Sequence, residues 1–309
     1  MPFRYGRGML PHLHALGPHV TVLGGAEGGK YPDGNSVLVR GSHTSVIIDP
    51  ALCVRSSPNP VVVDRVLLTH AHEDHVGGVS AVQFGEISVH RLDLPGLQSA
   101  EGLMHLYGIP EEVWPAMTEM VTERFHFVGW PDATALDDGD VIELGGVTVR
   151  VVHAPGHTAG HSVYVVDSPI ERERVVVTGD IDLSSFGPYY GDRVSSLPDF
   201  EATLRAVRAI EAAHYVTFHH KGVVDGHAAF AEAVDRYLAV IAHRHDHLLH
   251  LLEQRRTFDE LVDEGIVYRP GTRPHLFGTP VEVRSIQQHL DRALADGAAA
   301  TDGHHYWRT

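Results

Sequence analysis

Three histidines and an aspartate occur at the spacing His-x-His-x-Asp-His in residues 70–75. They come directly after a β-branched and apolar run, residues 66–69, that is short enough to be a buried strand. In an extended chain, side chains two residues apart point to the same side, so His70 and His72 can converge on one ion. If a helix begins just beyond them, Asp74 and His75 lie in its first turn and can face a second ion. Imidazole and carboxylate are ligands of zinc and related metals, so the pattern predicts metal-dependent chemistry.

Chance is the alternative explanation for any histidine cluster here, because the chain contains 25 histidines. A lone His-x-His would be attributed to chance, whereas four ligand residues at the end of a buried strand favour a metal site. Asp180 supports this from a separate part of the chain. It follows another apolar run, residues 175–177, and lies next to Gly179. A carboxylate in such a place needs a charged partner, for which a metal ion is the best candidate.

These residues resemble the signature of the metallo-β-lactamase superfamily, whose other motifs also occur in order along the chain. They are Asp49 in Ile47-Ile48-Asp49-Pro50, His157 in Pro155-Gly156-His157-Thr158, Asp180 in Thr178-Gly179-Asp180, and a last histidine in Phe218-His219-His220-Lys221-Gly222. The resemblance therefore extends over residues 49–222. It implies an α/β fold, the αββα sandwich of this superfamily, and the chemistry of a metal-dependent hydrolase.

The resemblance also implies a role for each of these side chains. The implied ligands of one metal ion are His70, His72 and His157. The implied ligands of the second are Asp74, His75 and His220, and Asp180 would bridge both. His220 is preferred to His219 because the family's histidine usually lies at the turn that leaves the strand. Asp49 would not bind metal itself but would orient one of the ligands.

The implied cofactor is a pair of divalent metal ions. Zinc is the first choice, and iron or manganese are the alternatives because His and Asp ligands suit all three. A hydroxide held between the two metals would attack an acyl or phosphoryl centre, so Asp74 and Asp180 are assigned the catalytic role. No serine or cysteine nucleophile is required, and Cys53 is expected to be a small buried residue.

Two blocks of short strands are expected to position these residues. Strands are predicted at residues 19–23, 36–40, 44–49, 66–69, 86–89, 141–144, 147–152, 162–166, 175–177 and 215–218. Apolar residues at helical spacing predict a helical insertion at 93–127. From residue 226 three helices are predicted, the second opened by a capping box at 257–260 and the third running over 285–295. We therefore expect a catalytic domain over residues 1–225 and a helical C-terminal segment over 226–309, similar to the winged-helix appendage of some family members.

The composition limits the partners that can be expected. The formal net charge is −16, from 40 acidic and 24 basic residues, which disfavours nucleic acid because phosphates are bound mainly by Lys and Arg. No apolar run reaches the roughly 18 residues of a membrane helix, and no apolar stretch of the signal-peptide kind follows the first basic residues. A single cysteine excludes a disulfide within the chain. A cytoplasmic enzyme acting on a small molecule is expected, and formation of a homo-oligomer is left open.

Details of the motifs narrow the expected reaction. The related diiron oxidoreductases carry glutamate at the position of His72, so hydrolysis is favoured. Residues 155–161 are most similar to thioesterases of the glyoxalase II type and to quorum-signal lactonases, but those lactonases usually have a tyrosine where this chain has Leu183. Tyr189 and Tyr190 are the candidate substrate-binding residues. A small ester or thioester is the leading substrate; a nuclease or phosphodiesterase, a lactonase and a redox-active diiron protein are the alternatives.

Overall fold

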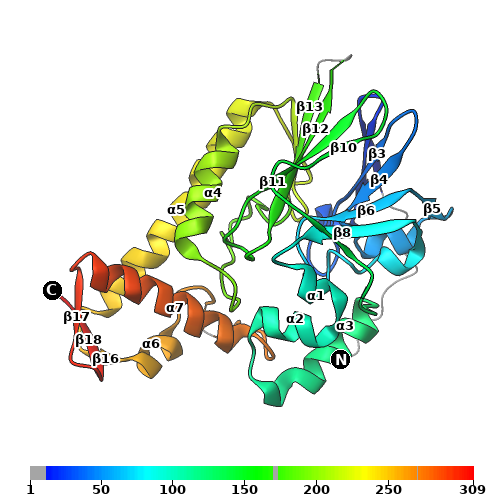
Figure 1. The fold of residues 1–309 in the computed structure, drawn as a ribbon. Helices are drawn as coiled ribbons and strands as arrows, with labels where there is room; N and C mark the ends of the chain where they lie inside the picture. The colour runs from blue at the N-terminus through cyan, green and yellow to red at the C-terminus, as the bar shows by residue number, and fades with distance from the viewer. Residues whose placement is uncertain (1–11, 170–172, 270) are drawn as a thin grey trace.

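Two β-sheets form the centre of the molecule, and helices cover their outer faces (Figure 1). The structure is a computed structural model that describes residues 12–169, 173–269 and 271–309. The first sheet has the strand order β1-β2-β3-β4-β6-β8-β9. Its strands are β1 His12–Leu16, β2 Val20–Gly24, β3 Ser36–Arg40, β4 Ser45–Ile48, β6 Arg65–Leu68, β8 Glu86–His90 and β9 Thr134–Leu136. Because β4, β6, β8 and β9 run parallel, their carboxyl ends meet at one edge.

The second sheet has the order β10-β11-β12-β13-β14-β15. Its strands are β10 Val141–Glu143, β11 Thr148–His153, β12 Ser162–Ser168, β13 Glu173–Val177, β14 His214–Val216 and β15 Val223–Asp225. Shorter elements lie in the connections: β5 Val61–Val62, β7 Val82–Gln83 and the 3-10 helices η1 Ala26–Gly28, η2 Leu52–Ser56, η3 Val79–Ala81 and η4 Glu111–Val113. Among the described strands of the second sheet, only β13 and β14 run parallel to each other. Asp180, which follows β13, and the residues that follow β14 therefore lie at the same end of this sheet.

Alternation of side chains along the strands explains the layered packing. Successive strand residues point to opposite faces, so Val37 and Val39 of β3 both face the second sheet. There they join Tyr164 and Val166 of β12 in the core between the sheets. Residues that alternate with these point to the opposite face. Ile47, between Val46 and Ile48 of β4, is an example and packs beneath the helices.

Each sheet has its own helical cover. The first is covered by α1 Leu94–Gln98, α2 Ala100–Tyr107 and α3 Trp114–Arg124, the helices of the predicted insertion. The second is covered by α4 Leu197–Arg208 and α5 His227–Leu251. This order of layers confirms the predicted αββα sandwich.

The C-terminal segment contains the three predicted helices and a small sheet that was not predicted. The helix α6 Phe258–Glu264 begins with the expected capping box between Thr257 and Glu260. The helix α7 Gly278–Ala295 begins seven residues earlier than expected, because Pro280 is tolerated in a first turn although glycine and proline argue against helix elsewhere. The strands β16 Arg256–Thr257, β18 His305–Arg308 and β17 Ala299–Thr301 complete a winged-helix order of elements. They are too short to give a clear pattern in the sequence.

The long helix α5 is shared between two packing clusters. Its first half, with Phe230 and Val234, packs against the second sheet. Its last residues pack with α6 and α7 through Leu248. Helix α5 therefore connects the packing of the second sheet with that of α6 and α7. Within the described residues, no helix has the length and apolar character needed to cross a membrane.

Candidate metal centre

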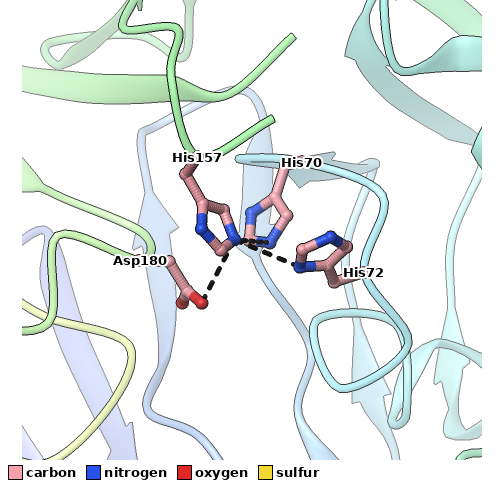
Figure 2. Close-up of side chains that lie close together, drawn as sticks. All are labelled: His70, His72, His157 and Asp180. Carbon is pink, nitrogen blue, oxygen red and sulfur yellow. Dashed lines mark hydrogen bonds and ion pairs between the residues drawn. The ribbon is translucent and has the colours of Figure 1, made fainter. Parts of the chain in front are cut away.

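Four side chains from three separate loops converge at the carboxyl edge of the sheets (Figure 2). They are His70 and His72 after β6, His157 between β11 and β12, and Asp180 after β13. Nε2 of His157 lies 3.1 Å from Nε2 of His70 and 3.1 Å from Nδ1 of His72. The same atom is 3.4 Å from Oδ2 of Asp180. Ligand atoms around a tetrahedral zinc ion, each about 2.0–2.1 Å from it, are about 3.3 Å apart, so this group has suitable spacing for one ion.

A second group lies beside the first and shares its aspartate. It consists of Asp74, His75 and His219, all buried. Nε2 of His219 lies 2.9 Å from Oδ2 of Asp74. The other oxygen of Asp180, Oδ1, is 3.0 Å from Nε2 of His75 and 3.9 Å from Nε2 of His219. Asp180 therefore directs one oxygen to each group, as a bridging carboxylate would.

The outer nitrogens of the first three histidines each face a hydrogen-bond acceptor. Nδ1 of His157 lies 3.0 Å from the carbonyl oxygen of Tyr189. Nε2 of His72 is 2.7 Å from Oδ2 of Asp192. Nδ1 of His70 is 3.1 Å from Oγ1 of Thr69, whose proton is donated to Asp49. An imidazole that donates from its outer nitrogen presents a free lone pair on the inner one, which is the state required of a metal ligand.

The two histidines of the second group are arranged in the same way. Nδ1 of His219 lies 2.7 Å from the carbonyl oxygen of Gly29. Nδ1 of His75 lies 3.0 Å from Oδ2 of Asp49. Asp49 is itself fixed, because it accepts from both the backbone and the hydroxyl of Thr69. Five inner nitrogens thus face the space around Asp180, and the donor set fits two cations.

Burial and nearby charges set the protonation of these side chains. Burial holds the pKa of His70 and of His157 well below the usual value, which keeps both rings neutral. Burial also acts on His72, but the Asp192 carboxylate outweighs it and raises the pKa of His72 to about 9. For Asp180, His75 and then His219 outweigh burial and hold the carboxyl pKa well below its usual range. The site therefore contains ionised carboxylates facing imidazoles.

The structure brings His219, and not His220, into the second group, which corrects the preference derived from the sequence. His219 is buried, whereas His220 is exposed and has a φ of 62°. The backbone of His220 is thus left-handed, and His220 borders the cavity described below without being a member of either group. The other sequence-predicted ligands are His70, His72, Asp74, His75, His157 and Asp180, and all of them lie in the two groups.

Separate alanine substitutions of the two neighbouring histidines test which of them is a metal ligand. Replacing His219 by alanine is expected to remove about one metal ion per chain, because the second group loses a buried nitrogen. Replacing His220 by alanine should leave the metal content unchanged. Elemental analysis of both variants, purified with excess metal, measures this. A loss of metal in the His220 variant alone would identify His220 as the ligand, as the sequence predicts.

Two aspartates support the site but were missed in the sequence. Asp93 accepts from Thr158 and from the backbone of Gly160 and Ala71, so it ties the loop of His157 to that of His70. Asp192 contacts His72 and accepts from the Tyr189 hydroxyl. Both aspartates lie in connections without a local pattern. The position of Asp93, soon after the carboxyl end of β8, is the one available signal.

His161 has a structural role beside the metal groups. Its Nδ1 lies 2.9 Å from the carbonyl oxygen of Ala154, and its Nε2 accepts from the backbone N–H of Asp180. Gly179 precedes Asp180 with a φ of 54°, and a Cβ there would lie 2.6 Å from the His161 ring. The close approach of the Gly179 backbone to the His161 ring thus requires glycine. It also fixes the position of the Asp180 backbone.

A cavity of about 320 Å³ opens above the two groups. His72, Asp74, His157, Asp180 and His219 lie on its floor. Its walls include Tyr107 and Met117 of the helical insertion, which also pack in the core beneath that insertion. Tyr189 borders the cavity, but Tyr190 is buried and its hydroxyl contacts Nε2 of His289 at 2.9 Å. Of the two candidate tyrosines, only Tyr189 borders the cavity.

Comparison with known proteins agrees with this arrangement. The family described as "Metallo-beta-lactamase superfamily" matches residues 31–220. A hydroxyacylglutathione hydrolase of Aeromonas hydrophila is 33% identical over 41% of this chain and 40% of its own length. An acyl-coenzyme A thioesterase, MBLAC2, of Homo sapiens is 30% identical over 49% of this chain and 60% of its own length. The match thus spans about half the length of these relatives.

Solved structures show the same fold over a greater length. A metallo-beta-lactamase family protein of Thermus thermophilus superposes with a TM-score of 0.66 at 23% identity, over 96% of this chain and all of that one. A beta-lactamase domain protein of Burkholderia ambifaria gives a TM-score of 0.67 at 18% identity, over 100% of this chain and 96% of its own. The C-terminal segment is therefore included in the structural likeness.

Proposed function

Because this chain belongs to the metallo-beta-lactamase superfamily, we propose that it is a metal-dependent hydrolase with two divalent ions that cleaves a small thioester or ester. The observation that carries the proposal is the inward orientation of five imidazole nitrogens around Asp180. Zinc is the proposed metal, with iron and manganese as alternatives. The proposal includes a catalytic domain over residues 1–225 with the helical insertion, a helical C-terminal segment over 226–309 and a cytoplasmic location.

Some side chains would bind the metal ions, and others orient those ligands. His70, His72 and His157 would hold one ion, and Asp74, His75 and His219 the other, with Asp180 shared. Bound divalent ions would lower the pKa of water toward neutrality and polarise the carbonyl of the substrate. Asp49 and Asp192 keep the rings of His75 and His72 in position through their outer nitrogens. The cavity walls would limit the water that reaches the acyl carbon of a bound substrate.

The surroundings of the site favour a thiolate leaving group over an alkoxide. An alkoxide is strongly basic and benefits from a nearby acid, whereas a thiolate leaves without one. Leu183 is buried and supplies no proton. The hydroxyl of Tyr189 is donated to Asp192, and those of Tyr31 and Tyr107 are donated to Glu73. The named relatives, a hydroxyacylglutathione hydrolase and an acyl-coenzyme A thioesterase, support the same choice.

A comparison of thioesters with lactones tests this choice. We expect metal-loaded enzyme to hydrolyse small thioesters and to lose less than about tenfold in kcat/KM when Tyr189 and Tyr190 are both replaced by phenylalanine, because no proton donor is needed. Initial rates on matched thioester and lactone panels measure this. The Tyr190→Phe variant alone serves as the control for stability, since the Tyr190 hydroxyl contacts His289 and Arg244. Lactone turnover well above thioester turnover, abolished in the double variant, would assign the lactonase reaction instead.

A further inference from the structure

The cavity above the metal groups has walls that come from three different parts of the chain. Ile109 and Met117 belong to the helical insertion, and Phe186 to the loop after Asp180. Tyr268, Phe277 and Val281 belong to the C-terminal segment, beyond the residues that the family match covers. Figure 1 shows α7 reaching from the C-terminal strands toward α2, and Arg284 of α7 donates to the carbonyl of Gly108 there. The C-terminal segment therefore forms one side of the cavity.

The chemistry of the walls differs from that of the floor. Ile109, Met117 and Val281 are each less than 9% exposed and carry no polar atom beyond a thioether. Among the described residues that line the cavity there is no lysine or arginine. The charged groups on this surface include Glu73 and Asp182, in addition to the aspartates of the metal groups. An anionic group at the end of the ligand remote from the metal groups would thus meet apolar side chains and carboxylates, and no lysine or arginine among the described residues.

We propose that this cavity binds an uncharged, apolar acyl group, and that α7 limits its length. The proposal rests on the proposed thioesterase function and adds the class of acyl group. Burial of an unpaired carboxylate in apolar surroundings is strongly unfavourable, whereas methylene groups gain from leaving water. The volume of about 320 Å³ is near the lower end of ligand sites, which favours a short to medium chain.

Acyl groups of equal length separate charge from size. Hexanoyl and adipoyl thioesters of N-acetylcysteamine share a neutral leaving thiol and differ in a terminal carboxylate. We expect kcat/KM for hexanoyl to exceed that for adipoyl by at least about 100-fold. Equal rates, or a preference for adipoyl, would overturn the proposal while leaving the thioesterase function intact.

A paired substitution on α7 tests the wall itself. Val281 is 2% exposed and lines the cavity, whereas Val283 is 36% exposed and does not line it. Val281→Phe is expected to lower the hexanoyl-to-acetyl ratio of kcat/KM about tenfold or more, and Val283→Phe to leave it unchanged. If Val281→Phe fails to fold, Val281→Ala should shift the preference toward octanoyl. An unchanged chain-length profile in a folded Val281 variant contradicts the role of α7.

Binding without turnover distinguishes this inference from the proposed function. Calorimetry on the metal-loaded enzyme would compare the S-hexyl thioether of N-acetylcysteamine with the S-(5-carboxypentyl) thioether, neither of which can be hydrolysed. Preferential binding of the hexyl compound without hydrolysis of any thioester would support the cavity assignment and refute the thioesterase function. Failure to bind the hexyl compound would refute the cavity assignment.

Discussion

Replacement of His72 by alanine is expected to reduce kcat/KM by about 10³-fold or more and to lower the metal content. Its Nδ1 lies 3.1 Å from Nε2 of His157, so the first group loses a ligand at its centre. Each ion is expected to provide several kcal/mol of transition-state stabilisation, which corresponds to this loss of rate. Elemental analysis and initial rates on the same preparation measure both effects, with about two ions per chain expected in the parent protein.

The His247→Ala variant is the matched control for this experiment. His247 lies exposed on α5, outside both groups of ligands, so neither metal content nor rate should change. If the His72 variant kept its full metal content and full activity, the first group of ligands would not be required for the reaction. A metal-replete parent protein that contains one ion or none would contradict the two-metal arrangement, even if the fold is correct.

The ligands that the sequence predicts lie in the loops that follow strands. His70, His157 and Asp180 each follow or precede an apolar run at the carboxyl edge, where strand direction alone brings them together. The choice between His219 and His220 could not be made in this way. It depends on the backbone of the turn, where His220 has a φ of 62° and is exposed while His219 is buried. Spacing along the sequence carries no information about such a turn.

The outer partners of the histidines were beyond prediction for a different reason. Asp192 lies 120 residues from His72 in the sequence, and Gly29 lies 190 residues from His219. Gly29 contributes only its backbone carbonyl, which every residue type possesses. Likewise, the cavity walls on α7 are ordinary apolar residues of an amphipathic helix. Their role follows from where α7 packs, which the pattern in the sequence does not determine.

Asp192 connects the first metal group to the loop that follows Asp180. Its Oδ2 lies 2.7 Å from Nε2 of His72, and its Oδ1 accepts from the Tyr189 hydroxyl at 3.0 Å. The Ser195 hydroxyl accepts from the backbone N–H of Asp192 and donates to the carbonyl of His157. The same loop therefore orients His72 through a side chain and His157 through the Tyr189 carbonyl. Arg244 of α5 holds this loop by donating to the carbonyls of Pro188 and Phe186.

We expect Asp192→Asn to weaken metal binding at the first group by about 10- to 100-fold, because the amide keeps the shape of the carboxylate but loses the charge that orients His72. Competition with a chelator of known affinity measures this without reference to turnover. Asp199→Asn, an exposed change in the first turn of α4, is the matched control and should leave metal affinity unchanged. The KM for a thioester should change less than kcat at limiting metal, since Asp192 acts on the ligand and not on the acyl group. Undiminished metal affinity in a folded Asp192→Asn protein would show that the first group is held in place by packing alone.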